Sequence, residues 1–230
     1  MPVAERRGGL RASQKIVHLP AVLVVIGGQQ VEHIVVGMAA SGRAQDRMPP
    51  IPADKLTDAQ KKAIEEFKAA RAADISGPFV PLLRSPEVMS RARAMGDYLR
   101  FKSSLPPRLS EFVILLTARR WTQQYEWNAH QPLAIKGGLR SDIVDAIAEG
   151  RRPERMAGDE EAVYALIDEL QRNQSVSDRI YASAIAAVGE QGLIDAIGIA
   201  GQYTMLAMVL NTARTPLPDG AKPALAPFPR

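Results

Sequence analysis

One carboxylate and one histidine stand at a spacing that suits proton transfer. Glu126 and His130 are four residues apart, so on a helix they share one face, with Cβ atoms about 5–6 Å apart. A carboxylate beside an imidazole can fix the tautomer of the ring, and together they form a general acid–base pair. Tyr125 and Trp127 flank Glu126 and would give the pair an apolar wall. A purely structural contact between the two side chains is the alternative.

Glu111 is a third candidate, because it begins an apolar run on a helix expected to face the core. It lies 19 residues before His130, which on one continuous helix amounts to about 28 Å. The two side chains can therefore meet only if the helix breaks near residues 121–123 and folds back. Thr122 could cap the second piece, but no Gly or Pro forces a break. A structural role for Glu111 in a helix interface stays open.

Composition excludes several kinds of chemistry. The 230 residues include no Cys, so disulfides, thiolate metal sites and thiol nucleophiles are absent. Three scattered histidines predict no metal site. The net charge is +4, but residues 1–44 hold five basic and two acidic residues, and the other 186 hold 24 and 23. The body of the chain therefore gives no electrostatic support for nucleic-acid binding.

Residues 1–47 differ from the rest and are expected to form a leader. Basic residues up to Lys15 precede an apolar run over 19–26, the layout of a secretory signal peptide. The run is shorter than the roughly 20 residues that span a membrane. Gly42 and Ala44 form a small-x-small pattern that is compatible with cleavage before Gln45. We therefore expect a periplasmic or secreted protein, with a cytoplasmic protein carrying an N-terminal extension as the alternative.

Residues 48–230 are expected to form one all-α domain. Thr57 begins a capping-box motif, and Ser85-Pro86 and Pro106-Pro107 are typical helix starts. No segment alternates apolar and polar residues as a half-buried strand would. The proline-rich tail after Arg214 cannot be helical and is expected to pack as an extended arm. About seven helices are predicted, over 57–71, 85–101, from 106 onward, 141–150, 159–170, 177–189 and 190–213.

The segment 105–139 resembles the carboxymuconolactone decarboxylase family, which includes the AhpD-like alkylhydroperoxidases. The shared pattern is an early Glu, a site segment a dozen residues later, a His, and an Ala-x-x-x-Gly helix end. Glu111, Gln123, Glu126, His130, Ala134 and Gly138 occupy these positions. The segment 201–211 resembles the last helix of this superfamily, so the similarity covers roughly 85–215. The resemblance implies an AhpD-like helical bundle that assembles as a homo-oligomer: a dimer, trimer or hexamer.

Gln123 and Glu126 stand where the peroxidase branch has the two cysteines of a CxxC pair, so thiol-based peroxide reduction does not carry over. The Glu-x-x-x-His arrangement is similar to the decarboxylase branch, which acts on a carboxylated lactone and needs no cofactor. The resemblance implies that His130 donates a proton and Glu126 orients it. The expected catalytic residues are His130, Glu126 and Glu111, and the expected substrate-binding residues are Arg119, Arg120, Gln123, Tyr125 and Trp127.

Two other interpretations stay open: a non-catalytic ligand-binding or assembly module on the same scaffold, and a peroxidase that uses no thiol. Arg119 and Arg120 could equally form a solvated face or a subunit contact, and Trp127 could serve only in packing. The expected partners are a small-molecule substrate and further copies of the chain, with no nucleic acid, no membrane for the mature form, no cofactor and no metal. A closed pocket lined by Glu126 and His130 would distinguish an enzyme from a scaffold.

Overall fold

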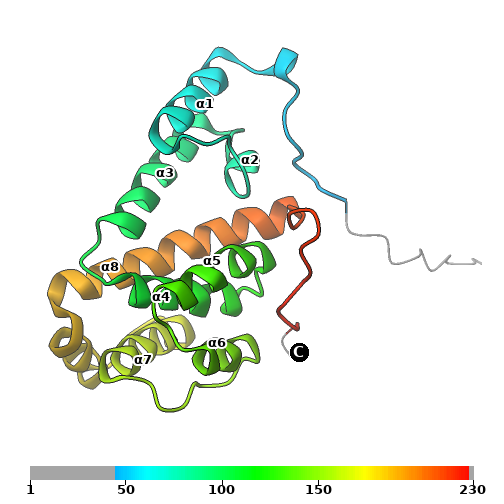
Figure 1. Ribbon diagram of the computed structural model, residues 1–230. Coiled ribbons are helices and arrows are strands. Elements are labelled where there is room, and N and C mark those ends of the chain that lie inside the picture. The colour runs from blue at the N-terminus through cyan, green and yellow to red at the C-terminus, as the bar shows by residue number, and fades with distance from the viewer. Residues whose placement is uncertain (1–44, 228–230) are drawn as a thin grey trace, which may run out of the picture. The chain divides into compact units, whose positions relative to one another are not determined.

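Helices joined by short turns build residues 45–227, the part of the chain that the computed structural model describes (Figure 1). All of them fall within a unit that spans Gly42–Arg230. This part contains eight α-helices, one 3₁₀ turn and no strand, which confirms the all-α prediction. The elements are η1 Ala53–Lys55, α1 Asp58–Arg71, α2 Phe79–Leu82, α3 Pro86–Phe101, α4 Pro107–Arg120, α5 Gln124–Lys136, α6 Ser141–Ala148, α7 Gly158–Asn173 and α8 Asp178–Ala213. The leader expected over 1–47 lies almost wholly outside the described residues.

Helix α4 is the centre of the bundle, and it packs against α3, α5, α6, α7 and α8. Its side chains are buried nearly all around the axis, and Phe112, Val113 and Leu115 are fully enclosed. A helix with no exposed stripe belongs in the core of a domain. Glu111 therefore projects its carboxylate from a core helix, in surroundings that few acidic side chains occupy.

Local sequence signals set several helix ends where they were predicted. Thr57 Oγ1 accepts a hydrogen bond from Gln60 N, and Gln60 Oε1 accepts one from Thr57 N, which completes the capping box. Pro86 and Pro107 each occupy the first turn of their helices. The four-residue helix α2 was not predicted, because a single turn is too short to show helical periodicity.

Helix α8 consists of two segments separated at Gly189, where the backbone leaves helical geometry with φ 72° and ψ 175°. The sequence predicts a boundary at this residue, because glycine tolerates positive φ. By length and composition α8 is apolar enough to cross a membrane, but 56% of its most apolar window is buried inside the fold. In the described chain it serves as a core helix, which contacts α2, α3, α4 and α7.

The chain breaks after α4 and returns as α5. Thr122 adopts a left-handed φ of 47°, and Gln123 N donates to Ala118 O at 2.8 Å. Gln123 also caps α5, because its Oε1 accepts a hydrogen bond from Tyr125 N at 2.6 Å. The break on which a meeting of Glu111 and His130 depends thus exists, although Gln123 rather than Thr122 is the capping residue. Helices α4 and α5 form a hairpin, and the early part of α4 faces the middle of α5.

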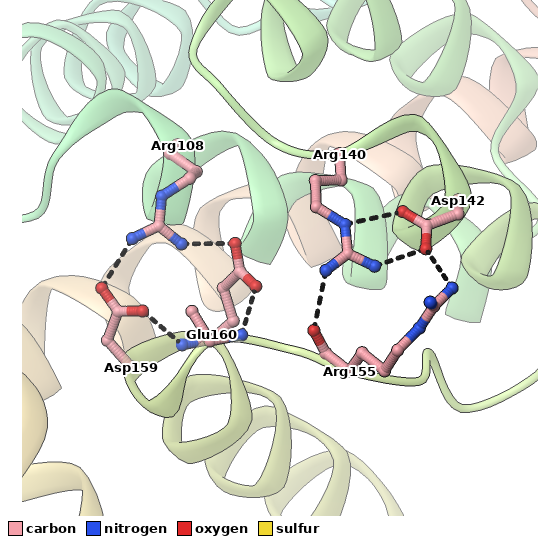
Figure 2. A network of polar contacts seen from close by, with 7 residues as sticks. Arg108, Arg140, Asp142, Arg155, Asp159 and Glu160 are labelled. Atoms are coloured by element: carbon pink, nitrogen blue, oxygen red, sulfur yellow. Dashed lines mark hydrogen bonds and ion pairs between the residues drawn. The ribbon is translucent and has the colours of Figure 1, made fainter.

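Arginine side chains fasten the connection between α6 and α7 (Figure 2). The guanidinium of Arg108, on α4, pairs with Asp159 at 2.6 Å and with Glu160, both at the start of α7. Glu160 also accepts a hydrogen bond from Ala157 N, so one carboxylate holds both the helix start and α4. A second cluster on the same connection consists of Arg140, Asp142 and Arg155.

The proline-rich tail packs as the predicted extended arm. Gln124 Oε1 accepts hydrogen bonds from Ala224 N and Leu225 N, and Gln124 Nε2 donates to Leu225 O at 2.6 Å. Arg119 Nη1 donates to Ala226 O at 3.1 Å. Leu225 is buried, so the arm adds one apolar anchor to the core beside the turn between α4 and α5.

Candidate active site

Both ring nitrogens of His130 are engaged by buried side chains. Nδ1 lies 2.6 Å from Glu111 Oε2, and Nε2 lies 3.1 Å from the hydroxyl of Tyr203. The rings of His130 and Tyr203 meet edge to face, with centroids 5.0 Å apart. Helices α4, α5 and α8 each contribute one member of this chain. The break between α4 and α5 has therefore brought Glu111 to His130.

The hydrogen bonds assign the tautomer of His130. Burial raises the pKa of Tyr203 well above its ordinary value, so its hydroxyl keeps its proton and donates to Nε2. Nδ1 then carries the ring proton and donates to the Glu111 carboxylate. The sequence predicts Glu126 as the group that orients His130; in the structure Glu111 and Tyr203 hold the ring.

Glu126 is a buried carboxyl group without a full set of partners. It is 3% exposed, and its Oε1 has no hydrogen-bond partner among the described residues. Its Oε2 lies 3.6 Å from His130 Nε2, beyond hydrogen-bonding distance. Burial raises the pKa of Glu126 above its ordinary value of 4.5, against the opposing charges of His130 and Arg100. Glu126 is therefore suited to hold a proton that it can give to a bound molecule.

Glu126, His130 and Tyr203 line one cavity of about 190 Å³. This volume is below the roughly 300–1,000 Å³ typical of sites for drug-sized ligands, so the cavity suits a smaller molecule. Its lining residues include both polar and apolar side chains. The polar lining residues also include Arg71, Arg100, Tyr125 and Gln202, and the apolar ones include Phe67, Phe79, Ala129 and Leu206.

The two arginines of the cavity differ in what they contact. Arg71 pairs with Asp97, with Nε at 2.9 Å and Nη2 at 2.8 Å from Oδ1, and it also lies over the rings of Phe67 and Phe79. Arg100 has no carboxylate within ion-pairing distance among the described residues, and its Nε is buried without a hydrogen-bond partner. Arg100 is therefore the cation that an anionic ligand in the cavity can engage.

A loop between α1 and α2 covers one side of the cavity. Ser76 and Pro78 line it, and Gly77 between them has a φ of +54°. A Cβ at position 77 would lie 2.6 Å from Cε1 of Tyr125, so the backbone of the loop packs directly against the tyrosine ring and leaves no room for a side chain. Glycine meets both requirements, because it lacks a Cβ and tolerates positive φ.

Four of the expected substrate-binding residues do not line this cavity. Gln123 caps α5 and donates to Asn211 Oδ1 at 2.8 Å, and Trp127 is buried in the apolar core. Arg119 and Arg120 line a different cleft, because they lie at the opposite end of α4 from Glu111. Tyr125 lines the cavity. Between residues 45 and 227, no group of three His, Asp or Glu side chains could hold a metal ion.

The sequence did not identify Arg100, Gln202 or Tyr203 as site residues. Tyr203 is 73 residues from His130, and no spacing rule connects residues on separate helices. The available signal was a pair of polar residues, Gln202 and Tyr203, within the apolar run of α8. Gln202 uses its amide to donate to Ala92 O at 2.9 Å, which ties α8 to α3 beside the cavity.

Comparison with known proteins defines the fold. No family model and no curated protein matches the sequence. The AhpD core of an uncharacterised peroxidase-related protein from Ralstonia eutropha superposes with a TM-score of 0.61 and 15% identity, over 75% of this chain and 92% of that one. A protein of unknown function from Agrobacterium tumefaciens, described as a candidate AhpD antioxidant defence protein, gives 0.53 and 14%, over 60% and 94%. The chain has an AhpD-like fold, as the resemblance implied, and its sequence lacks the CxxC pair.

Proposed function

We propose that the cavity binds a small carboxylated lactone or a related acid and catalyses a cofactor-independent decarboxylation with proton transfer. The observation that supports this most is a pair of buried polar atoms without hydrogen-bond partners among residues 45–227, Glu126 Oε1 and Arg100 Nε, in residues that line the same cavity. Buried polar atoms are nearly always hydrogen-bonded, so an unpaired donor and acceptor in one cavity favour a ligand site.

The proposed reaction begins when the bond between the substrate carbon and its carboxylate breaks. Carbon dioxide leaves, and the electron pair moves into the conjugated lactone. Arg100 stabilises the negative charge that develops on the lactone oxygen. Glu126 gives its proton to the carbon and becomes a carboxylate, which a proton from water restores. Phe79 and Leu206 provide the apolar surroundings that disfavour the charged substrate carboxylate.

This proposal gives the role of proton donor to Glu126, whereas the resemblance implied His130. Both nitrogens of His130 already have partners, but Oε1 of Glu126 has none in the described chain. After proton transfer, Glu126 would carry a negative charge 3.6 Å from His130 Nε2. His130, whose ring Glu111 and Tyr203 fix, would favour that negative charge electrostatically.

The test is a screen of carboxylated lactones and small carboxylic acids for release of carbon dioxide. We expect turnover by the wild type, and its loss in both Glu126→Gln and His130→Ala, with unchanged helical circular dichroism. Arg91→Gln, an exposed change on α3, should retain activity. A lactone that binds to the wild type without turnover would instead support the non-catalytic ligand-binding module.

Peroxide reduction by thiols is not part of the proposal. One of the two solved structures is named peroxidase-related, but the 230 residues of this chain include no Cys to be oxidised. If the chain nevertheless consumed an alkyl hydroperoxide, the reaction would need chemistry that Glu126 and His130 do not provide. A peroxide-consumption assay on the purified chain should therefore give no activity above buffer.

Assembly and export remain predictions. Exposed apolar side chains on α3 and α8, among them Met95, Phe101 and Ile194, support the proposed homo-oligomer, because a second copy could cover them. Analytical ultracentrifugation measures the number of copies. Export depends on the leader, and N-terminal sequencing of protein recovered from the periplasm would test cleavage before Gln45.

A further inference from the structure

A second cleft, separate from the cavity of Glu126, is lined by α4, α6, α7 and the residues that follow α6. Its volume is about 480 Å³. Five arginines line it and Asp168 is the single carboxylate among its lining residues. The arginines are Arg119, Arg120, Arg151, Arg152 and Arg172. Basic and acidic residues nearly balance after residue 44, so this concentration of positive charge is local.

The carboxylates near these arginines form exposed ion pairs. Arg172 pairs with Asp168, and the arginine side chain is 63% exposed. Arg152 pairs with Glu161 in the same manner, and Arg151 pairs with Glu149. Exposed ion pairs contribute little to stability, because water and salt screen them. An anionic ligand can therefore replace these carboxylates at small cost.

Arg120 and Arg119 add positive charge from the end of α4. Arg120 has no carboxylate within ion-pairing distance among the described residues, and its Nη2 donates to Gln171 O at 3.3 Å. Arg119 donates to Ala226 O, so the C-terminal arm is anchored by a residue that lines the cleft. The guanidinium of Arg152 lies 5.1 Å from the ring centroid of Tyr164, and this cation–π contact holds the guanidinium at the cleft.

We propose that this cleft binds a small organic polyanion that carries at least two phosphate or carboxylate groups. Guanidinium groups bind such oxygens through paired, charge-assisted hydrogen bonds, and several arginines around one hollow suit several anionic groups. The volume lies within the roughly 300–1,000 Å³ typical of small-molecule sites. A concave site in a region of the chain, residues 45–230, where basic and acidic residues nearly balance favours a small ligand over nucleic acid.

Isothermal titration calorimetry of the full chain tests this proposal with pyrophosphate and citrate as probes. Pyrophosphate represents a phosphate ligand and citrate a carboxylate ligand, and sodium chloride at equal ionic strength is the reference. We expect at least one probe to bind with one site per chain. The double variant Arg120→Gln, Arg172→Gln should weaken that binding at least tenfold. Saturable binding by neither probe would overturn the proposal.

Matched variants locate the binding. Arg91→Gln removes an exposed arginine of α3 that also has a single carboxylate partner, and it should leave binding unchanged. Glu126→Gln should also leave it unchanged, because Glu126 lines the other cavity. The double variant Arg120→Lys, Arg172→Lys keeps the charges and should retain part of the affinity, which distinguishes lost contacts from misfolding. An equal loss in Arg91→Gln, or no loss in the double Gln variant, would contradict the proposal.

Discussion

The cavity of Glu126 and the arginine cleft contain the same kinds of charged side chain and differ in burial. Glu126 is 3% exposed with an oxygen that has no partner in the described chain, whereas Arg172 is 63% exposed and pairs with Asp168. A buried carboxyl without a full set of partners changes its protonation, but an exposed pair keeps its charges and is screened. The first region therefore suits proton transfer, and the second suits binding of an anion.

The largest expected effect comes from Glu126→Gln. The amide keeps the shape of the side chain but cannot transfer the proton. The kcat for decarboxylation should therefore fall about 10²- to 10⁴-fold. Steady-state kinetics with a lactone from the screen measure this. Arg172→Gln in the cleft should leave kcat unchanged. An equal loss of kcat in both variants would contradict the proposal that the two regions have separate functions.

Arg100→Gln should have the next largest effect on activity. A hydrogen bond to a charged group contributes about 1.5–3 kcal/mol, which corresponds to a decrease of roughly 10- to 150-fold in kcat/KM. The matched control is Arg120→Gln, which removes an arginine that also lacks a carboxylate partner in the described chain but lines the cleft. An equal decrease in kcat/KM for Arg120→Gln and Arg100→Gln would contradict binding of the substrate in the cavity that Arg100 lines.

Gly77→Ala tests the close contact that covers the cavity. The positive φ alone should cost about 1–2 kcal/mol. The contact of the new Cβ with the Tyr125 ring should add about 1–3 kcal/mol of overpacking. Gly220→Ala is the control, because its φ is +80° and its Cβ would have no neighbour within 4 Å. Chemical denaturation of both variants measures the difference, and equal costs would show that Tyr125 moves aside freely.

Tyr203→Phe should lower the free energy of unfolding by about 1–3 kcal/mol, because it leaves Nε2 of His130 buried without its hydrogen-bond partner. Tyr181→Phe removes the hydroxyl of a side chain that is half exposed and should change stability little. Urea denaturation of the two variants gives the comparison. Similar values for both would mean that the hydroxyl of Tyr203 does not hold the imidazole.

The pH dependence of stability gives the smallest effect. Burial raises the pKa of Glu126 in the folded protein above its ordinary value of 4.5. The stability that this raised pKa contributes is fully present below about pH 4.5, and it is lost as the pH rises through the pKa of Glu126 in the folded protein. Wild type should lose up to about 1.4 kcal/mol per pH unit more than Glu126→Gln within this window. Parallel curves for the two proteins would contradict the raised pKa.

The sequence predicted helix ends better than it predicted the site. Capping residues such as Thr57 and breakers such as Gly189 act within a few residues, so their effects could be predicted directly. The turn at Thr122 is accompanied by a hydrogen bond from Gln123 to Asn211, which lies on the distant helix α8 and which no local sequence signal indicates. Tyr203 and Arg100 could not be predicted for the same reason, because they reach the cavity only when α3 and α8 pack against the rest of the bundle. Arg119 and Arg120 were close in sequence to the site but lie at the far end of α4.

The proposed reaction requires Glu126 to hold a proton when a small acid enters the cavity, which agrees with the raised pKa of this buried carboxyl. Difference infrared spectroscopy between wild type and Glu126→Gln tests this most directly, because protonated and ionised carboxyl groups absorb at different frequencies. At the pH at which the enzyme turns over, we expect a protonated-carboxyl band that is absent from the variant and changes when the lactone binds. A difference spectrum that contains only carboxylate bands would contradict it.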